Sequence, residues 1–71
     1  MEIRYDPESD SVNIKFQRGK YEISEEIKDG IIVDLTKDGR VISIEILDAS
    51  RRIPKNDLNQ ITVGFPIRSG A

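Results

Sequence analysis

Apolar and polar residues alternate along most of the first 47 residues of the chain. In four segments, at 12–16, 21–27, 31–35 and 41–47, apolar residues recur at alternate positions, which is the pattern of a β-strand with one buried face; Glu25 interrupts the pattern in the second segment. The apolar positions that define them are Val12, Ile14 and Phe16; Tyr21, Ile23 and Ile27; Ile31, Val33 and Leu35; and Ile42, Ile44 and Ile46. A first short strand is expected at residues 2–5, and no helical period occurs before residue 48. The pattern therefore predicts about five short strands.

Turn signals separate these segments at intervals of about ten residues. Residues 28–30 and residues 37–39 both read Lys-Asp-Gly, and the segments 6–11 and 18–20 are also rich in turn-forming residues. An Asp-Gly pair tolerates the positive φ angles that tight hairpin turns require. Gly30 and Gly39 are therefore expected to be structural, and the strands to follow one another as an antiparallel β-meander.

The pattern changes after Leu47. Asp48 is expected to cap the following turn with its carboxylate, and Pro54 suits the first turn of a short helix. Residues 61–65 resume the strand alternation, and residues 68–71 form a polar end that is expected to be flexible. The predicted fold class is α+β and mostly β: an antiparallel meander of about five strands, a short helix and a final strand, in one domain over residues 1–67.

The second face of the predicted sheet is not uniformly polar, because Ile32, Val41 and Leu47 lie on it. The short helix and the final strand can cover one face, but little of the chain is left to cover the other. We therefore expect these three residues to contribute to a dimer or partner surface.

Chain length and composition also favour self-association. A chain of 71 residues buries a modest fraction of its surface, and with no cysteine it has neither disulfides nor thiolate metal sites. Association with a second copy is the remaining way to bury more apolar surface.

The composition argues against an enzyme. Without histidine and cysteine, the common pairs of nucleophile and base cannot be built. The segment 6–11 places acids at alternate positions, as a calcium loop does, but Ser11 stands where that loop needs glycine. We expect no catalytic residues, no cofactor and no metal.

Charge bears on the choice of partner. Thirteen acids outnumber eleven bases, which does not favour a nucleic-acid binder. Arg51 and Arg52 are instead expected to contact a protein partner or to pair with a charge cluster formed by Asp34, Glu45 and Asp48. The chain has no apolar run long enough to span a membrane, and its acidic start is unlike a signal peptide, so a cytoplasmic location is expected.

Two stretches resemble domain-of-unknown-function family 2283, a group of small bacterial and archaeal proteins. The stretches are YDPESDSVNIKF at residues 5–16 and SEEIKDGIIVDLTKDGRVISIEILDASRRIP at residues 24–54. The pattern includes Tyr5, Asp6 and Asp10, the two Asp-Gly turns, and the Asp-Ala-Ser of residues 48–50. The resemblance implies no known activity and no catalytic residues; some members are encoded beside genes for proteins that resemble small ribonuclease-type toxins.

The expected function is that of a non-catalytic protein-interaction module that self-associates. The alternative, implied by the resemblance, is an antitoxin-like inhibitor or accessory protein that binds a small toxin-like partner encoded nearby.

Overall fold

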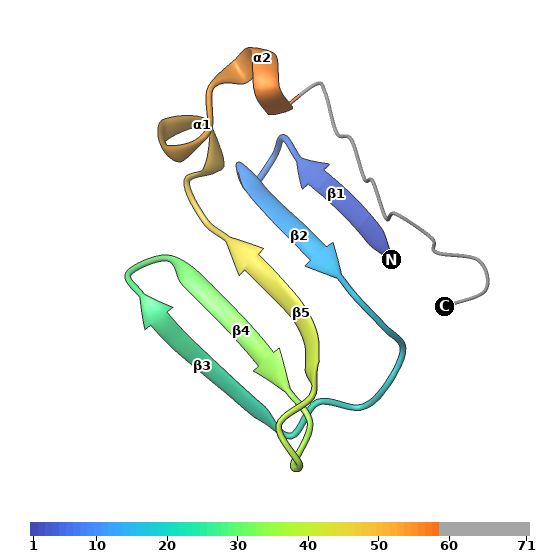
Figure 1. Ribbon diagram of the computed structural model, residues 1–71. Coiled ribbons are helices and arrows are strands. Elements are labelled where there is room, and N and C mark those ends of the chain that lie inside the picture. Colours follow the sequence, from blue (N-terminus) through green and yellow to red (C-terminus); the bar gives the residue numbers. More distant parts are fainter. Residues whose placement is uncertain (59–71) are drawn as a thin grey trace, which may run out of the picture.

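The computed structural model describes residues 1–58 as one antiparallel sheet followed by two short helices (Figure 1). The elements are β1 (Glu2–Asp6), β2 (Ser11–Lys15), β3 (Ile23–Lys28), β4 (Ile31–Leu35), β5 (Val41–Ile46), α1 (Ala49–Arg52) and α2 (Lys55–Leu58). The predicted five-stranded α+β class is confirmed. The strand expected at residues 61–65, the domain limit at residue 67 and the end at residues 68–71 lie outside the described residues.

The order of the strands across the sheet is β1-β2-β5-β4-β3. The pairs β1–β2, β3–β4 and β4–β5 are hairpins, and β5 lies in the centre between β2 and β4. Residues 16–22 connect β2 to β3 at the far edge of the sheet, so this connection is longer than a hairpin turn. Tyr21, expected in a strand, lies in this connection and is exposed.

The register places the alternating apolar residues on one side of the sheet, because residues paired across antiparallel strands share a face. Ile3, Ile14, Ile44 and Val33 form one row across four strands, and Glu25 ends that row on the edge strand β3. We call this side the apolar face; its members are Ile3, Tyr5, Val12, Ile14, Phe16, Ile23, Ile31, Val33, Leu35, Ile42, Ile44 and Ile46.

The opposite side is the polar face. Its rows across the sheet follow the same register, and its members are Glu2, Arg4, Asp6, Ser11, Asn13, Lys15, Ser24, Glu26, Ile32, Asp34, Ser43 and Glu45. The sheet therefore has one apolar and one polar side, as an antiparallel sheet with one solvated face should.

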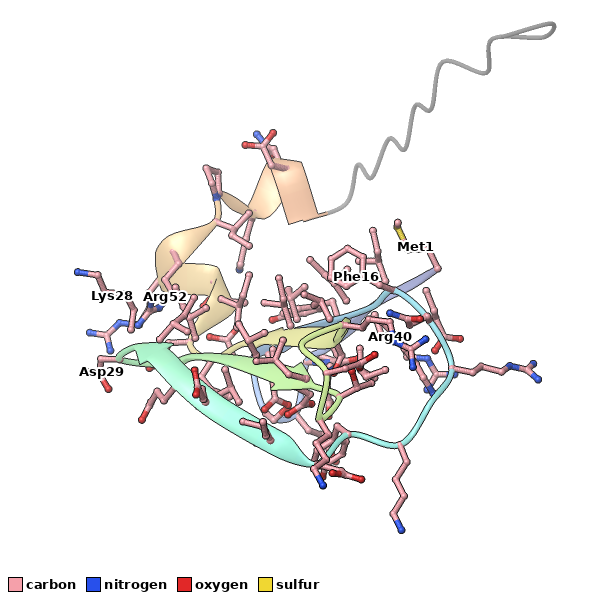
Figure 2. The ribbon with its side chains drawn as sticks, turned by 60° about the horizontal axis from the view of Figure 1, so that its bottom comes forward. Met1, Phe16, Lys28, Asp29, Arg40 and Arg52 are labelled. Carbon is pink, nitrogen blue, oxygen red and sulfur yellow. The ribbon has the colours of Figure 1, made fainter. Side chains whose placement is uncertain are left out.

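Segments of the chain cover the apolar face at two ends. At one end α1 packs against β2, where Ala49 is fully buried and Val12 is 6% exposed. At the other end the backbone of Gly19 lies against Ile42, which is 4% exposed. Figure 2 shows both helices and the Phe16 side chain on the same side of the sheet. Within residues 1–58 no helix is long and apolar enough to cross a membrane.

Candidate functional site

The carboxylate of Asp10 ties the β1–β2 turn to the first helix. Its Oδ1 accepts hydrogen bonds from the Tyr5 hydroxyl at 2.8 Å and from the Ser50 backbone N–H at 3.1 Å, and its Oδ2 accepts one from the Ser50 hydroxyl at 2.7 Å. The carbonyl of Asp10 also accepts a bond from the Ala49 N–H at 2.8 Å. The pKa of Asp10 is lowered from its ordinary value of 3.8, first by the Ser50 hydroxyl and then by that of Tyr5. One carboxylate thus joins segments 40 residues apart.

Asp10 also caps helix α1, and the capping role expected for Asp48 is wrong. Asp48 precedes the helix but its side chain makes no capping hydrogen bond. Its backbone is left-handed, with φ 51° and ψ 44°, and aspartate tolerates this conformation better than most residues do. Asp48 therefore turns the chain out of β5, and Asp10 supplies the acceptor for the first N–H groups of α1.

Arg52 fastens the other side of α1. Its Nη2 donates a hydrogen bond to the carbonyl of Asp29 in the β3–β4 turn. Gly30 makes room for this contact, because a Cβ at that position would stand 2.8 Å from Nη2 of Arg52. Figure 2 shows Arg52 at this end of the sheet, near Lys28 and Asp29.

These contacts explain why the Asp-Ala-Ser-Arg-Arg segment follows the central strand. Ala49 fills the buried position, Ser50 binds Asp10 and Arg52 binds the β3–β4 turn. The segment holds a one-turn helix over the end of the sheet. The most distinctive residues of the chain therefore have a structural role, which we call the α1 clasp (Tyr5, Asp10, Ala49, Ser50 and Arg52).

The most prominent surface in residues 1–58 is the uncovered middle of the apolar face. Of its members only Val12 and Ile42 are buried; Tyr5, Phe16 and Ile23 are exposed and the others are half-buried. Ile27, beside this face on β3, is 59% exposed. An apolar surface this continuous is typical of an interaction site.

The three apolar residues predicted on the second face do not form one patch. Ile32 is half-buried and lies on the polar face between Glu26 and Glu45. Val41 is exposed at the far end of β5, where a register shift occurs, and half-buried Leu47 lies beside Gly30. Their part in partner binding stays a prediction, but the structure separates them.

The predicted charge cluster is also not assembled as expected. Asp34 accepts hydrogen bonds from Ser24 and Ser43, each at 2.7 Å, and these bonds join β3, β4 and β5 across the polar face. Among residues 1–58 the ion pairs are Arg4–Glu2 and Arg40–Asp38, so neither Arg51 nor Arg52 pairs with Asp34 or Glu45. The reason is topological: α1 lies on the apolar side of the sheet, whereas Asp34 and Glu45 are on the polar face.

The acidic segment 6–11 is a turn. Oδ1 of Asp6 accepts the N–H of Glu8 at 2.9 Å, as an Asx turn does, and Asp10 is engaged in the α1 clasp. In the part of the chain that the structure describes, no group of three or more metal-binding side chains comes together.

Sequence reasoning missed Tyr5, Asp10 and Ser50 as contact partners. Tyr5 was expected only as a residue of the first strand, and Asp10 as part of a turn. The one available signal is that all three belong to the motifs by which the chain resembles its family. Tyr5 and Asp10 are five residues apart, but Asp10 and Ser50 are 40 residues apart in sequence.

The chain is similar in sequence to known proteins. The chain is 44% identical over 59 residues to a Methanosarcina mazei protein named "Putative hypoxanthine phosphoribosyltransferase". That match covers 80% of this chain and 47% of the relative, so the chain spans about half the length of this curated relative. No solved structure matches this chain. The sequence profile described as "Protein of unknown function (DUF2283)" matches residues 2–50, which include four of the five residues of the α1 clasp. The resemblance is thereby confirmed, and the chain belongs to the DUF2283 family.

Proposed function

We propose that this protein is a non-catalytic interaction module that self-associates by packing the apolar face of its sheet against the same face of a second copy. The observation that carries the proposal is the burial of that face: its central residues Ile14, Val33 and Ile44 are half-buried in the part of the chain that the structure describes. Apolar area removed from water stabilises an interface by about 25 cal/mol per Å². A second copy supplies a matching apolar surface.

The size of the face supports a dimer contact. Five strands spaced about 4.8 Å apart span about 24 Å, and strands of five to six residues are about 18 Å long. The sheet plane therefore measures roughly 400 Å², and its middle is the open part. Stable interfaces bury about 800 Å² on each partner, so this face corresponds to the smaller interfaces of weak, reversible complexes.

The edges of the sheet are less suited to association than its face. Edge strand β3 carries a register shift between Glu26 and Lys28, and Glu25 places a charge on its apolar side. The other edge strand, β1, is followed directly by Pro7. Bulges, prolines and inward charges are the features by which proteins prevent edge-to-edge pairing. Face-to-face packing remains the more favourable mode.

A non-catalytic role fits the residue types present. The chain has no histidine and no cysteine, and the hydroxyl groups of Ser24 and Ser43 donate to Asp34 as ties between strands. The carboxylate of Asp10 is likewise occupied by Tyr5 and Ser50. These groups are explained by structural contacts, and none of them requires a substrate.

The test is the mass of the full chain in solution, measured by light scattering during gel filtration over a wide range of loading concentrations. We expect a dimer that dissociates on dilution. A monomer at every concentration would contradict self-association. A monomer that forms a stable complex when co-expressed with a neighbouring-gene product would instead support the antitoxin-like or accessory role, with a different protein on the same apolar face.

A further inference from the structure

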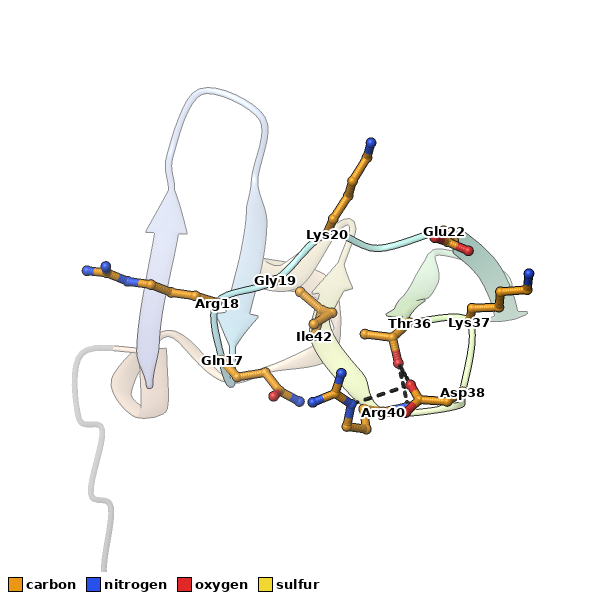
Figure 3. Close-up of a pocket in the computed structure, with 10 residues that line it drawn as sticks. All are labelled: Gln17, Arg18, Gly19, Lys20, Glu22, Thr36, Lys37, Asp38, Arg40 and Ile42. Atoms are coloured by element: carbon orange, nitrogen blue, oxygen red, sulfur yellow. Dashed lines mark hydrogen bonds and ion pairs between the residues drawn. The ribbon is translucent and has the colours of Figure 1, made fainter.

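We infer that the end of the sheet opposite the helices is a binding site for a small multivalent anion of the phosphate type. The β2–β3 connection and the β4–β5 turn line a pocket of about 390 Å³ at that end, which is open to solvent (Figure 3). Small-molecule sites usually measure about 300–1,000 Å³, so the pocket is large enough for a di- or triphosphate group. The site is remote from the α1 clasp, and of the described residues that line it only Ile42 belongs to the apolar face.

The charge of the pocket is opposite to that of the rest of the chain. Its lining contains four cations, Arg18, Lys20, Lys37 and Arg40, and two acids, Glu22 and Asp38, for a net charge of +2. The chain has eleven cations and thirteen acids in total, so the remaining seven cations and eleven acids leave −4 elsewhere. Charges more than about 8 Å apart are largely screened at physiological salt, so an anion at the pocket responds mainly to the local excess of cations.

One of the two acids, Asp38, already has hydrogen-bond partners within the turn. Asp38 accepts hydrogen bonds from the Thr36 hydroxyl and, at 3.4 Å, from Nε of Arg40. The Thr36 bond lowers the pKa of Asp38 from its ordinary value of 3.8, which keeps it ionised beside Arg40. This contact uses Nε of Arg40, and its two terminal nitrogens make no hydrogen bond to another residue of the described part of the chain. A guanidinium with two free nitrogens can donate to two oxygens of one phosphate.

The other cations lie on the two segments that border the pocket. Lys20 extends outward from the β2–β3 connection and Lys37 from the β4–β5 turn, whereas Arg18 extends away from that turn toward β1 and β2, as Figure 3 shows. Among residues 1–58 none of the three forms an ion pair. Long side chains at the rim of a pocket can turn toward an anion that enters it. The floor of the pocket is Ile42, which is buried and apolar. The small floor offers no aromatic surface for a base, so the recognised group is the phosphate part of a ligand.

The experiment is a titration of the full-length, ¹⁵N-labelled chain with sodium tripolyphosphate, followed by amide chemical shifts at constant ionic strength. We expect saturable shifts that are confined to residues 17–22 and 36–42. The double variant Lys20→Gln/Lys37→Gln should weaken binding by roughly tenfold, because each cation–anion contact at the surface changes affinity several-fold. The matched control Lys28→Gln/Lys55→Gln makes the same change in net charge away from the pocket and should leave the affinity within about twofold.

Two results would overturn the site. Shifts that grow linearly without saturation would show only general ionic attraction. An equal loss of affinity in the test and control variants would show that net charge, and not the pocket, attracts the anion. All four substituted lysines are exposed, so the variants should keep the wild-type amide spectrum elsewhere.

Discussion

Replacing Val33 by lysine tests the apolar face most severely, and the adjacent residue provides a matched control. Val33 and Ile32 are neighbours on β4 and both are half-buried, but Val33 lies on the apolar face and Ile32 on the polar face. The variants Val33→Lys and Ile32→Lys therefore introduce the same charge at the same depth, on opposite sides of the sheet.

The expected effect on Val33→Lys follows from its burial. Complete burial of a valine side chain contributes about 1.5–3 kcal/mol, and at most about a third of this remains for the dimer to supply, or about 0.5 kcal/mol per copy. Holding a lysine against an apolar surface costs about 1–2 kcal/mol more per copy, because its ammonium group must reach water. In a two-fold symmetric dimer both terms count twice, so the total is about 3–5 kcal/mol. This corresponds to a dissociation constant raised by roughly two to three orders of magnitude.

Ile32→Lys should behave differently. Its cross-strand neighbours are Glu26 and Glu45, so a lysine keeps its aliphatic stem on the sheet and places its charge between two acids. We expect the dimer dissociation constant to change by less than about threefold.

Sedimentation equilibrium of both variants measures these constants, with far-ultraviolet circular dichroism to show that each is folded. A folded Val33→Lys variant that associates as well as the wild type would refute face-to-face packing. Loss of association in Ile32→Lys alone would transfer the interface to the polar face.

Three further predictions concern the α1 clasp and the turns. Asp10→Asn should reduce hydrogen-exchange protection at the Ser50 amide, because one of the two carboxylate oxygens that accept hydrogen bonds from Ser50 becomes an NH2 group. Unchanged protection would show that the clasp does not hold α1. The pKa of Asp10 is lower in the folded chain than its ordinary 3.8, so its contribution to stability is present above that value and is lost as pH falls through the folded pKa. The stability of Asp10→Asn should therefore depend less on pH below about 4 than that of the wild type. Identical acid-unfolding profiles for the two proteins would contradict this. Gly30→Ala should destabilise the chain more than Gly39→Ala in chemical denaturation: both have positive φ, at a cost of about 1–2 kcal/mol, but only the Cβ at Gly30 meets Arg52. In an Arg52→Ala background the difference between the two glycine variants should shrink, and a constant difference would exclude the Arg52 contact as its cause.

The strands could be predicted from local pattern, because alternation and turn chemistry act over a few residues. Val12, Ile14, Val33, Ile44 and their companions share one face, as the sequence indicated. The order of the strands depends on pairing between distant segments. Nothing in the sequence near residues 16–22 shows that β5, rather than β3, lies beside β2.

The candidate sites were harder to predict than the fold, for the same reason. Asp48 has the residue type and position of a helix cap, yet its left-handed backbone serves the turn and a carboxylate from the β1–β2 turn takes the capping role. The part of Ile32 in a partner surface stays a prediction, because the coverage of each face cannot be read from alternation alone. Within residues 1–58 the strongly apolar side is the one left partly open.

Intermolecular nuclear Overhauser effects in a mixed sample test the central claim most directly. In a dimer prepared from one isotope-labelled and one unlabelled copy, filtered spectra detect only contacts between copies. Face-to-face packing predicts such contacts for the methyl groups of Val33 and Ile44 on the apolar face. A dimer whose intermolecular contacts come instead from Ile32 on the polar face, or from the edge strands β1 and β3 alone, would contradict it.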